Sequence, residues 1–130
     1  MKRIIQALIL FSVIIIFACN KEDKDNCISY DQASIFSADA PSTGLANQNI
    51  PIDISFQCRN GCGHFGSIEE TILGDLITIK AIAKYEGCAC FLGSVNIQTT
   101  HSLNISTAGV YYLRFLQSDN NYLSDTLIVQ

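Results

Sequence analysis

One stretch of the sequence decides the fold: Ile50-Pro51-Ile52-Asp53-Ile54-Ser55-Phe56-Gln57. Its isoleucines and its phenylalanine occupy every second position, and proline or polar residues fill the positions between them. Because successive side chains of a strand point to opposite faces, this alternation predicts an antiparallel strand with one face in the core and the other in water.

The same period of two continues through most of the chain. It is clear in residues 77–85 and 111–116, and shorter versions occupy residues 34–39, 64–73, 95–105 and 122–129. Turn-forming residues separate these candidate strands, and no segment after residue 20 has the apolar spacing of a helix. About seven short strands in ~100 residues predict an immunoglobulin-like β-sandwich of antiparallel strands over residues 33–130.

Tyr111 has two interpretations within this fold. It follows Gly109-Val110 at the start of a candidate strand, where immunoglobulin-like folds often place a corner tyrosine whose hydroxyl bonds back to the backbone. It is equally compatible with an ordinary core residue of an amphipathic strand. The sequence leaves both interpretations open.

Residues 1–18 have the composition of an export signal. Fourteen of them are hydrophobic, and two basic residues precede the apolar run from Ile4 to Phe17. That run is shorter than the about twenty residues of a membrane-spanning helix, and it matches the apolar region of a secretory leader. Residues 16–19, Ile-Phe-Ala-Cys, resemble the bacterial lipobox. We therefore expect cleavage before Cys19 and lipidation of its thiol, with a retained membrane anchor as the alternative.

Residues 19–32 follow the leader as a predicted tether. The segment from Asn20 to Asn26 carries five charges and no apolar side chain, so it buries too little surface to offset the entropy of ordering. We expect it to be flexible. Lys21-Glu22-Asp23 also resembles the signal that directs Bacteroidetes lipoproteins to the outer surface. These features predict an outer-membrane protein whose first partner is the membrane, through the lipid on Cys19.

The charge of the chain excludes one class of partner. The eight Lys and Arg stand against twelve Asp and Glu, which gives a formal net charge of −4. Loss of Lys2 and Arg3 with the leader leaves six basic residues against twelve acidic ones, and these basic residues are scattered. Because nucleic-acid binding needs clustered positive charge, we expect no nucleic-acid partner.

Several short segments of the mature chain form a familiar pattern. They are Asn60-Gly61-Cys62 with Phe65, the alternation through residues 77–85, Cys88 and Cys90, residues 107–113 and residues 125–129. Together they resemble small Bacteroidetes lipoproteins with an immunoglobulin-like domain. That family has no established activity, so the resemblance implies a fold and a location only.

The register of one hairpin is predictable. A two-residue turn at Gly74-Asp75 pairs Glu69 with Lys80, which is an attractive pair of opposite charges. Gly66 suits a bulge, and beyond that bulge we expect the register to shift by one residue. The direction that we expect for this shift places Cys62 opposite Cys88.

The five cysteines after the lipidation site predict disulfides, because an exported protein folds in an oxidising space. The expected hairpin register places Cys62 opposite Cys88 and Cys58 near Cys90. We therefore expect nested Cys62–Cys88 and Cys58–Cys90 bridges. Bridges within each pair, Cys58–Cys62 or Cys88–Cys90, are the alternative. Cys27 is either a free thiol or a partner that displaces one of the four.

A zinc site is a second interpretation of the cysteines. Cys58 and Cys62, followed by His64, supply ligands of the right type together with the Cys88 and Cys90 pair. The one-residue gap between the last two is unusual for structural zinc, whose cysteines are usually spaced by two to four residues. We expect no metal and no other cofactor.

Catalysis has little support in the sequence. The chain contains only two histidines, His64 and His101, and it lacks the nucleophile elbow, the phosphate loop and the metalloprotease helix. Glu70 falls on the same strand face as Ile68 and Ile72, which we interpret as a register shift in preference to a buried catalytic acid. We expect no enzyme activity.

With nucleic-acid binding, metal binding and catalysis set aside, we expect a non-catalytic binding or interaction module with a protein or glycan ligand. The candidate exposed aromatic residues are Tyr30, Phe91, Tyr112 and Tyr122. The alternative is a structural or assembly subunit of an envelope complex. A contiguous apolar patch that includes Phe91-Leu92 or Ile82 favours that alternative.

Overall fold

The computed structural model describes residues 27–130, which form eight strands and no helix within that range. The strands are β1 Ile28–Asp39, β2 Thr43–Gly44, β3 Asn49–Cys58, β4 Gly63–Leu73, β5 Leu76–Glu86, β6 Val95–Asn104, β7 Gly109–Ser118 and β8 Asn121–Val129. The predicted leader, Cys19 and the predicted tether up to residue 26 lie outside the described residues. Within residues 27–130, no helix is long and apolar enough to cross a membrane.

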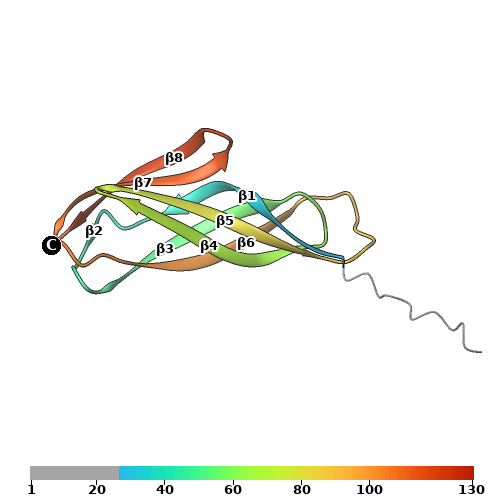
Figure 1. Ribbon diagram of the computed structural model, residues 1–130, viewed down its shortest axis with the longest axis horizontal. Helices are drawn as coiled ribbons and strands as arrows, with labels where there is room; N and C mark the ends of the chain where they lie inside the picture. Colours follow the sequence, from blue (N-terminus) through green and yellow to red (C-terminus); the bar gives the residue numbers. More distant parts are fainter. Residues whose placement is uncertain (1–26) are drawn as a thin grey trace, which may run out of the picture.

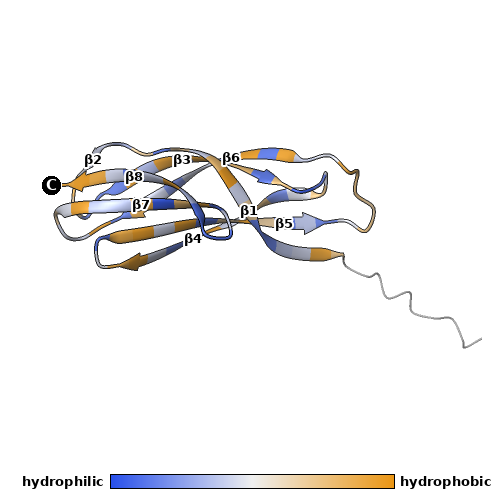
Figure 2. Ribbon diagram, turned by 90° about the horizontal axis from the view of Figure 1, so that it is seen from above, coloured by the Kyte–Doolittle hydropathy of each residue, from blue (hydrophilic) through white to orange (hydrophobic). Residues whose placement is uncertain are grey.

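The strands form one curled sheet that folds into two facing layers (Figures 1 and 2). One layer contains β2, β8, β7, β5 and β4, and the other contains β3 and β6. β1 belongs to both, because Ile28–Ala33 pairs with β5 and Ser34–Asp39 pairs with β3. The first part of β1 lies in the segment predicted as tether. Its side chains are mostly exposed, so backbone pairing with β5 explains its order better than burial does.

The core lies between the layers and follows the alternation of the strands. In β3 the apolar residues Ile50, Ile52, Ile54 and Phe56 are at most 2% exposed, and the residues between them are exposed or half-buried. Removing each such side chain from water stabilises the fold by about 1.5–3 kcal/mol. The prediction made from residues 50–57 is confirmed.

The β4–β5 hairpin has the predicted turn. Gly74 adopts a φ of 64°, and Glu69 lies opposite Lys80 as expected. A bulge interrupts the pairing at Gly66, where an added Cβ would approach the carbonyl oxygen of Ile82 to 2.7 Å, so glycine is required.

The direction of the register shift beyond this bulge was predicted wrongly. The extra residue belongs to β4, so His64 lies opposite Lys84 and the backbone of Cys62 reaches Glu86. The Glu86 N–H donates to the Cys62 carbonyl at 3.2 Å. Cys62 therefore does not face Cys88 across the hairpin.

Two strand pairs are parallel, so the expectation of antiparallel strands throughout is wrong for them. They are β5 with β7 and β2 with β8. After β5 the chain crosses to the other layer as β6 and returns as β7 in the direction of β5. Alternation of side chains reports which face is buried and contains no information on the direction of the neighbouring strand.

Tyr111 makes the corner bond that one of its two interpretations requires. Its hydroxyl donates to the Thr107 carbonyl at 2.9 Å, and the side chain is 9% exposed. The bond ties the start of β7 to the loop before it. This is the arrangement of a corner tyrosine in a β-sandwich.

Candidate functional site

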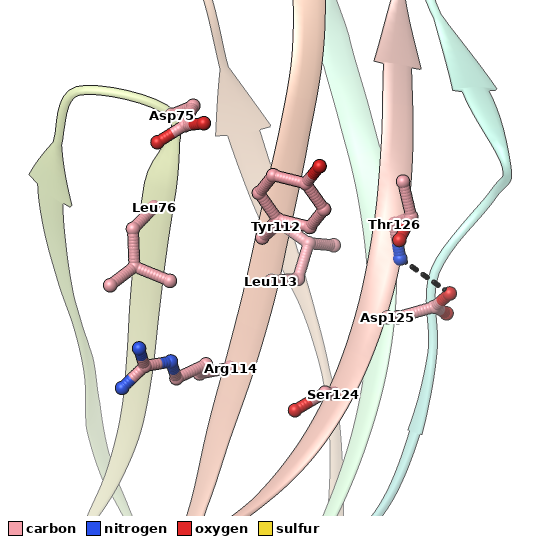
Figure 3. A pocket seen from close by; sticks show the side chains of 8 residues that line it. All are labelled: Asp75, Leu76, Tyr112, Leu113, Arg114, Ser124, Asp125 and Thr126. Atoms are coloured by element: carbon pink, nitrogen blue, oxygen red, sulfur yellow. Dashed lines mark hydrogen bonds between the residues drawn. The ribbon is translucent and has the colours of Figure 1, made fainter.

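A surface hollow of about 610 Å³ lies on the outer face of the layer that contains β5, β7 and β8. The outward side chains that line it are Asp75, Leu76, Tyr112, Arg114, Ser124 and Thr126 (Figure 3). It lies toward the end of the domain that holds the C-terminus, opposite the end where the chain enters (Figure 1). We call it the distal hollow.

Strand register sets the lining of the distal hollow. Leu76 lies beside Tyr112 in the parallel β5–β7 pair, and Thr126 lies opposite Tyr112 in the β7–β8 pair. Arg114 lies opposite Ser124 in the same way. Three neighbouring strands therefore supply one continuous surface. The parallel pairing that the sequence did not predict is what brings β5 to it.

The distal hollow offers several kinds of contact. Tyr112 is 52% exposed and supplies an aromatic ring beside Leu76. Arg114 brings a fork of N–H donors, and its Cζ lies 5.4 Å from the centre of the Tyr122 ring. Ser124 supplies a hydroxyl that both donates and accepts. An aromatic ring with a guanidinium and hydroxyls suits a ligand that has an apolar face and hydrogen-bond acceptors.

Two smaller hollows differ in character. One of about 320 Å³ lies on β3 and β6, where the Thr100 hydroxyl donates to Asp53 at 2.6 Å. Another of about 260 Å³ lies beside Arg59 and Tyr85. In both, polar side chains are already engaged with each other. The distal hollow is therefore the better candidate for a ligand.

The disulfides differ from the nested prediction. Cys27 pairs with Cys88, and Cys62 pairs with Cys90, while Cys58 is a free thiol and fully buried. The predicted Cys62–Cys88 and Cys58–Cys90 bridges are wrong. The alternative in which Cys27 displaces one of the four is the one that the structure shows.

Strand pairing explains this choice of partners. The Gly87 N–H donates to the Cys27 carbonyl at 2.9 Å, which brings the start of β1 beside Cys88. The β4 bulge moves Cys62 away from the position opposite Cys88. Cys58 ends β3 with its side chain in the core, where it is out of reach.

Cys58 lies under a polar cluster at the chain-entry end. The Arg59 N–H donates to the Tyr85 hydroxyl at 2.9 Å, the Arg59 Cζ lies 4.3 Å from the centre of the Tyr85 ring, and the guanidinium pairs with Asp31. Burial raises the pKa of the Cys58 thiol, and a hydrogen bond with Tyr85 partly opposes that rise. A neutral, buried thiol is a poor nucleophile and a poor metal ligand.

The zinc hypothesis loses most of its ligands to the disulfides. Cys62, Cys88 and Cys90 are all bridged. Among residues 27–130, no group of three or more His, Cys, Asp or Glu side chains is arranged to hold a metal ion.

His101 and Glu70 form a pair that sequence reasoning missed. The His101 Nε2 lies 2.7 Å from a Glu70 carboxylate oxygen, and the two side chains are 18% and 36% exposed. Glu70 lies opposite Ile79 with no shift of register, so the interpretation of Glu70 as a sign of a register shift is wrong. His64, which the sequence placed near Glu69 and Glu70, lies exposed on the other face of β4.

The four aromatic candidates do not gather at one site. Tyr30, Phe91 and Tyr112 are 60%, 65% and 52% exposed, and Tyr122 is half-buried. Of these, Tyr112 lines the distal hollow. The sequence signal for its neighbour Arg114 was the same alternation, which places both on the outward face of β7.

Fold and site together define a class of protein, a β-sandwich domain. Two disulfides stabilise one end of this domain, and the distal hollow lies near the other end. Residues 52–129 match the family model described as the ORF11 beta-sandwich domain, and the chain belongs to that family. No curated protein and no solved structure matches the chain significantly. The family match therefore supports the fold and brings no activity with it.

Proposed function

We propose that the protein is a lipid-anchored lipoprotein of the Bacteroidetes outer membrane whose domain binds a protein or glycan ligand without catalysis. The observation that carries the proposal is the distal hollow, where the exposed Tyr112 and the half-buried Arg114 lie on the same outward face of β7. The hollow lies away from the end where the chain enters from the proposed anchor at Cys19 (Figure 1). A ligand at that end meets no obstruction from the membrane.

An immunoglobulin-like arrangement is part of this proposal. Its support is the corner bond from Tyr111 to Thr107, together with the short pairing of β2 with the last strand. The parallel β5–β7 pair is a departure from the usual antiparallel sheets of that fold.

The binding test applies the purified protein to arrays of glycans and of envelope-protein peptides. We expect binding to one class and expect Tyr112→Ala and Arg114→Ala each to weaken it roughly tenfold or more, because buried aromatic and arginine contacts dominate binding energy. Tyr30→Ala is the matched control, since Tyr30 is an exposed tyrosine outside the hollow. Binding that survives both hollow variants contradicts the proposal.

The lipid anchor has a separate test. Labelled palmitate is expected in the wild-type protein and absent from the Cys19→Ser variant. Label in both contradicts the lipobox interpretation.

The alternative, a structural or assembly subunit, is favoured by exposed apolar side chains on the β7–β8 face, in addition to the exposed Phe91-Leu92. Val110 and Ile128 lie opposite each other on the outer face of β7 and β8, and they are 49% and 43% exposed. An exposed apolar pair in a sheet face suits contact with another protein. If the protein is a subunit of an envelope complex, we expect Val110→Ser to lower the amount of protein that migrates with the complex on native gels. We expect Tyr112→Ala to have little effect on that amount.

A further inference from the structure

The loop between β5 and β6, residues 87–94, presents two large apolar side chains to solvent. Leu92 is 101% exposed and Phe91 is 65% exposed. The eight residues of this loop, Gly-Cys-Ala-Cys-Phe-Leu-Gly-Ser, include no charged side chain. Contiguous exposed apolar side chains are a feature of surfaces that contact proteins or membranes.

The loop is held in this exposed conformation by covalent and backbone bonds. Cys88 is bridged to Cys27, and Cys90 is bridged to Cys62. The Gly61 N–H donates to the Phe91 carbonyl at 3.1 Å. The Phe91 ring packs over Gly61 and Gly93, where an added Cβ would overlap with it. The fold therefore fixes Leu92 outward, where it makes no core contact.

The position of the loop in the domain indicates which surface it contacts. Cys27, the first described residue, is bonded to Cys88, so the loop lies at the end of the domain where the chain enters (Figures 1 and 2). Cys27 follows Cys19 by eight positions, and at ~3.5 Å per residue this segment spans at most about 28 Å. A lipid on Cys19 therefore keeps this end of the domain close to the bilayer surface.

The charges around the loop present no barrier to that contact. The Lys84 Nζ lies 2.8 Å from a Glu86 carboxylate oxygen, and Arg59 pairs with Asp31. Each of these two basic groups is thus matched by an acidic one. Neither pair repels or strongly attracts a lipid headgroup layer.

We propose that Phe91 and Leu92 insert into the interface of the lipid bilayer and form a second membrane contact beside the lipid on Cys19. This inference rests on the proposed lipid anchor. Apolar side chains at such a contact lie about 5–10 Å deep, at the boundary between headgroups and acyl chains. The second contact fixes the orientation of the domain and points the distal hollow away from the membrane.

The test uses the absence of tryptophan from the chain, so that one introduced tryptophan is the only one present. The lipidated full-length protein with Leu92→Trp is reconstituted into vesicles of phosphatidylethanolamine and phosphatidylglycerol. We expect a blue-shifted emission and quenching by brominated acyl chains. Leu73→Trp is the matched control: Leu73 is 69% exposed at the β4–β5 turn, at the opposite end of the domain, and the emission of this variant is expected to stay that of a solvent-exposed indole.

The outcomes separate the two proposals. Failure of the wild-type protein to float with vesicles contradicts the lipid anchor. Flotation in which the Leu92→Trp and Leu73→Trp variants have equal emission overturns the second contact alone. A blue shift of the Leu92→Trp variant in native membranes that is absent in pure lipid vesicles also overturns it, because the loop then meets a protein. Unchanged melting temperatures of both variants show that neither substitution disturbs the fold.

Discussion

At the residue scale, the surroundings of Cys58 set the pKa of its thiol. It is fully buried at the end of β3, next to Gly63, whose added Cβ would overlap with it. Burial raises the pKa of its thiol above the ordinary value, because a thiolate is poorly solvated in the core. The folded state therefore binds the Cys58 proton more tightly than the unfolded state does.

This difference predicts a stability that declines in alkali. A raised folded-state pKa contributes stability that is complete below the unfolded pKa, ~8.5, and is lost as pH rises through the folded value. In the Cys19→Ser background, the difference in free energy of unfolding between the protein with Cys58 and the Cys58→Ala variant is expected to shrink between about pH 7 and pH 10. Urea unfolding across that range measures it.

A thiol titration provides the control for that experiment. In the Cys19→Ser background, Cys58 is expected to resist a thiol reagent at neutral pH until urea unfolds the protein. Rapid labelling of the native protein counts against a buried neutral thiol. So does a difference in free energy of unfolding between the Cys58 and Cys58→Ala proteins that does not change with pH.

At the scale of elements, the two disulfides tie three segments to one end of the sandwich. Cys27–Cys88 joins the start of β1 to the β5–β6 loop over 61 residues of sequence. Cys62–Cys90 joins the β3–β4 turn to the same loop over 28 residues. In the chain-entropy account, each closed loop contributes about 4 kcal/mol, slightly more for the longer one.

This arrangement makes Cys58 dispensable for bridging. Peptide mapping of the non-reduced Cys58→Ser protein is expected to show both bridges intact. Cys27→Ser is expected to lose one bridge and about 4 kcal/mol of stability in urea unfolding. Recovery of a peptide that joins Cys58 to Cys90 in the wild-type protein would support the nested disulfides and contradict the Cys62–Cys90 bridge.

At the scale of the whole molecule, the Glu70–His101 pair bridges one open side of the sandwich. β4 and β6 are the edge strands of opposite layers, and the inward face of β4 holds partly exposed residues such as Phe65 and Ile72. The pair lies 2.7 Å apart across this side, between strands that share no backbone ladder.

A double-mutant cycle measures what the pair contributes. Glu70→Gln and His101→Gln are expected to show a coupling of about 0.2–1 kcal/mol in unfolding free energy, because both side chains keep some contact with water. Glu69→Gln with His101→Gln is the matched control, since Glu69 is on the other face of β4. Equal coupling in the two cycles rejects a specific link between the layers.

Local features of the fold were predictable because a short segment contains their cause. The burial of Ile52 follows from alternation, the turn at Gly74-Asp75 from backbone freedom, and the bulge at Gly66 from the lack of a side chain. The outward position of Tyr112 and Arg114 also follows from their alternation with buried residues in residues 111–116. Their surroundings were not predictable, since Leu76 reaches them only through the parallel β5–β7 pair.

By itself, the sequence determined most of the strands, most of their buried faces and the hairpin turn, since each depends on residues within a few positions of each other. The tertiary structure alone decided that Cys27, and not Cys58, partners the β5–β6 loop, that β7 runs parallel to β5, and that Glu70 meets His101. These contacts join residues 31 or more positions apart. Which of them form depends on the path of the chain between the two layers, and period-two patterns do not record that path.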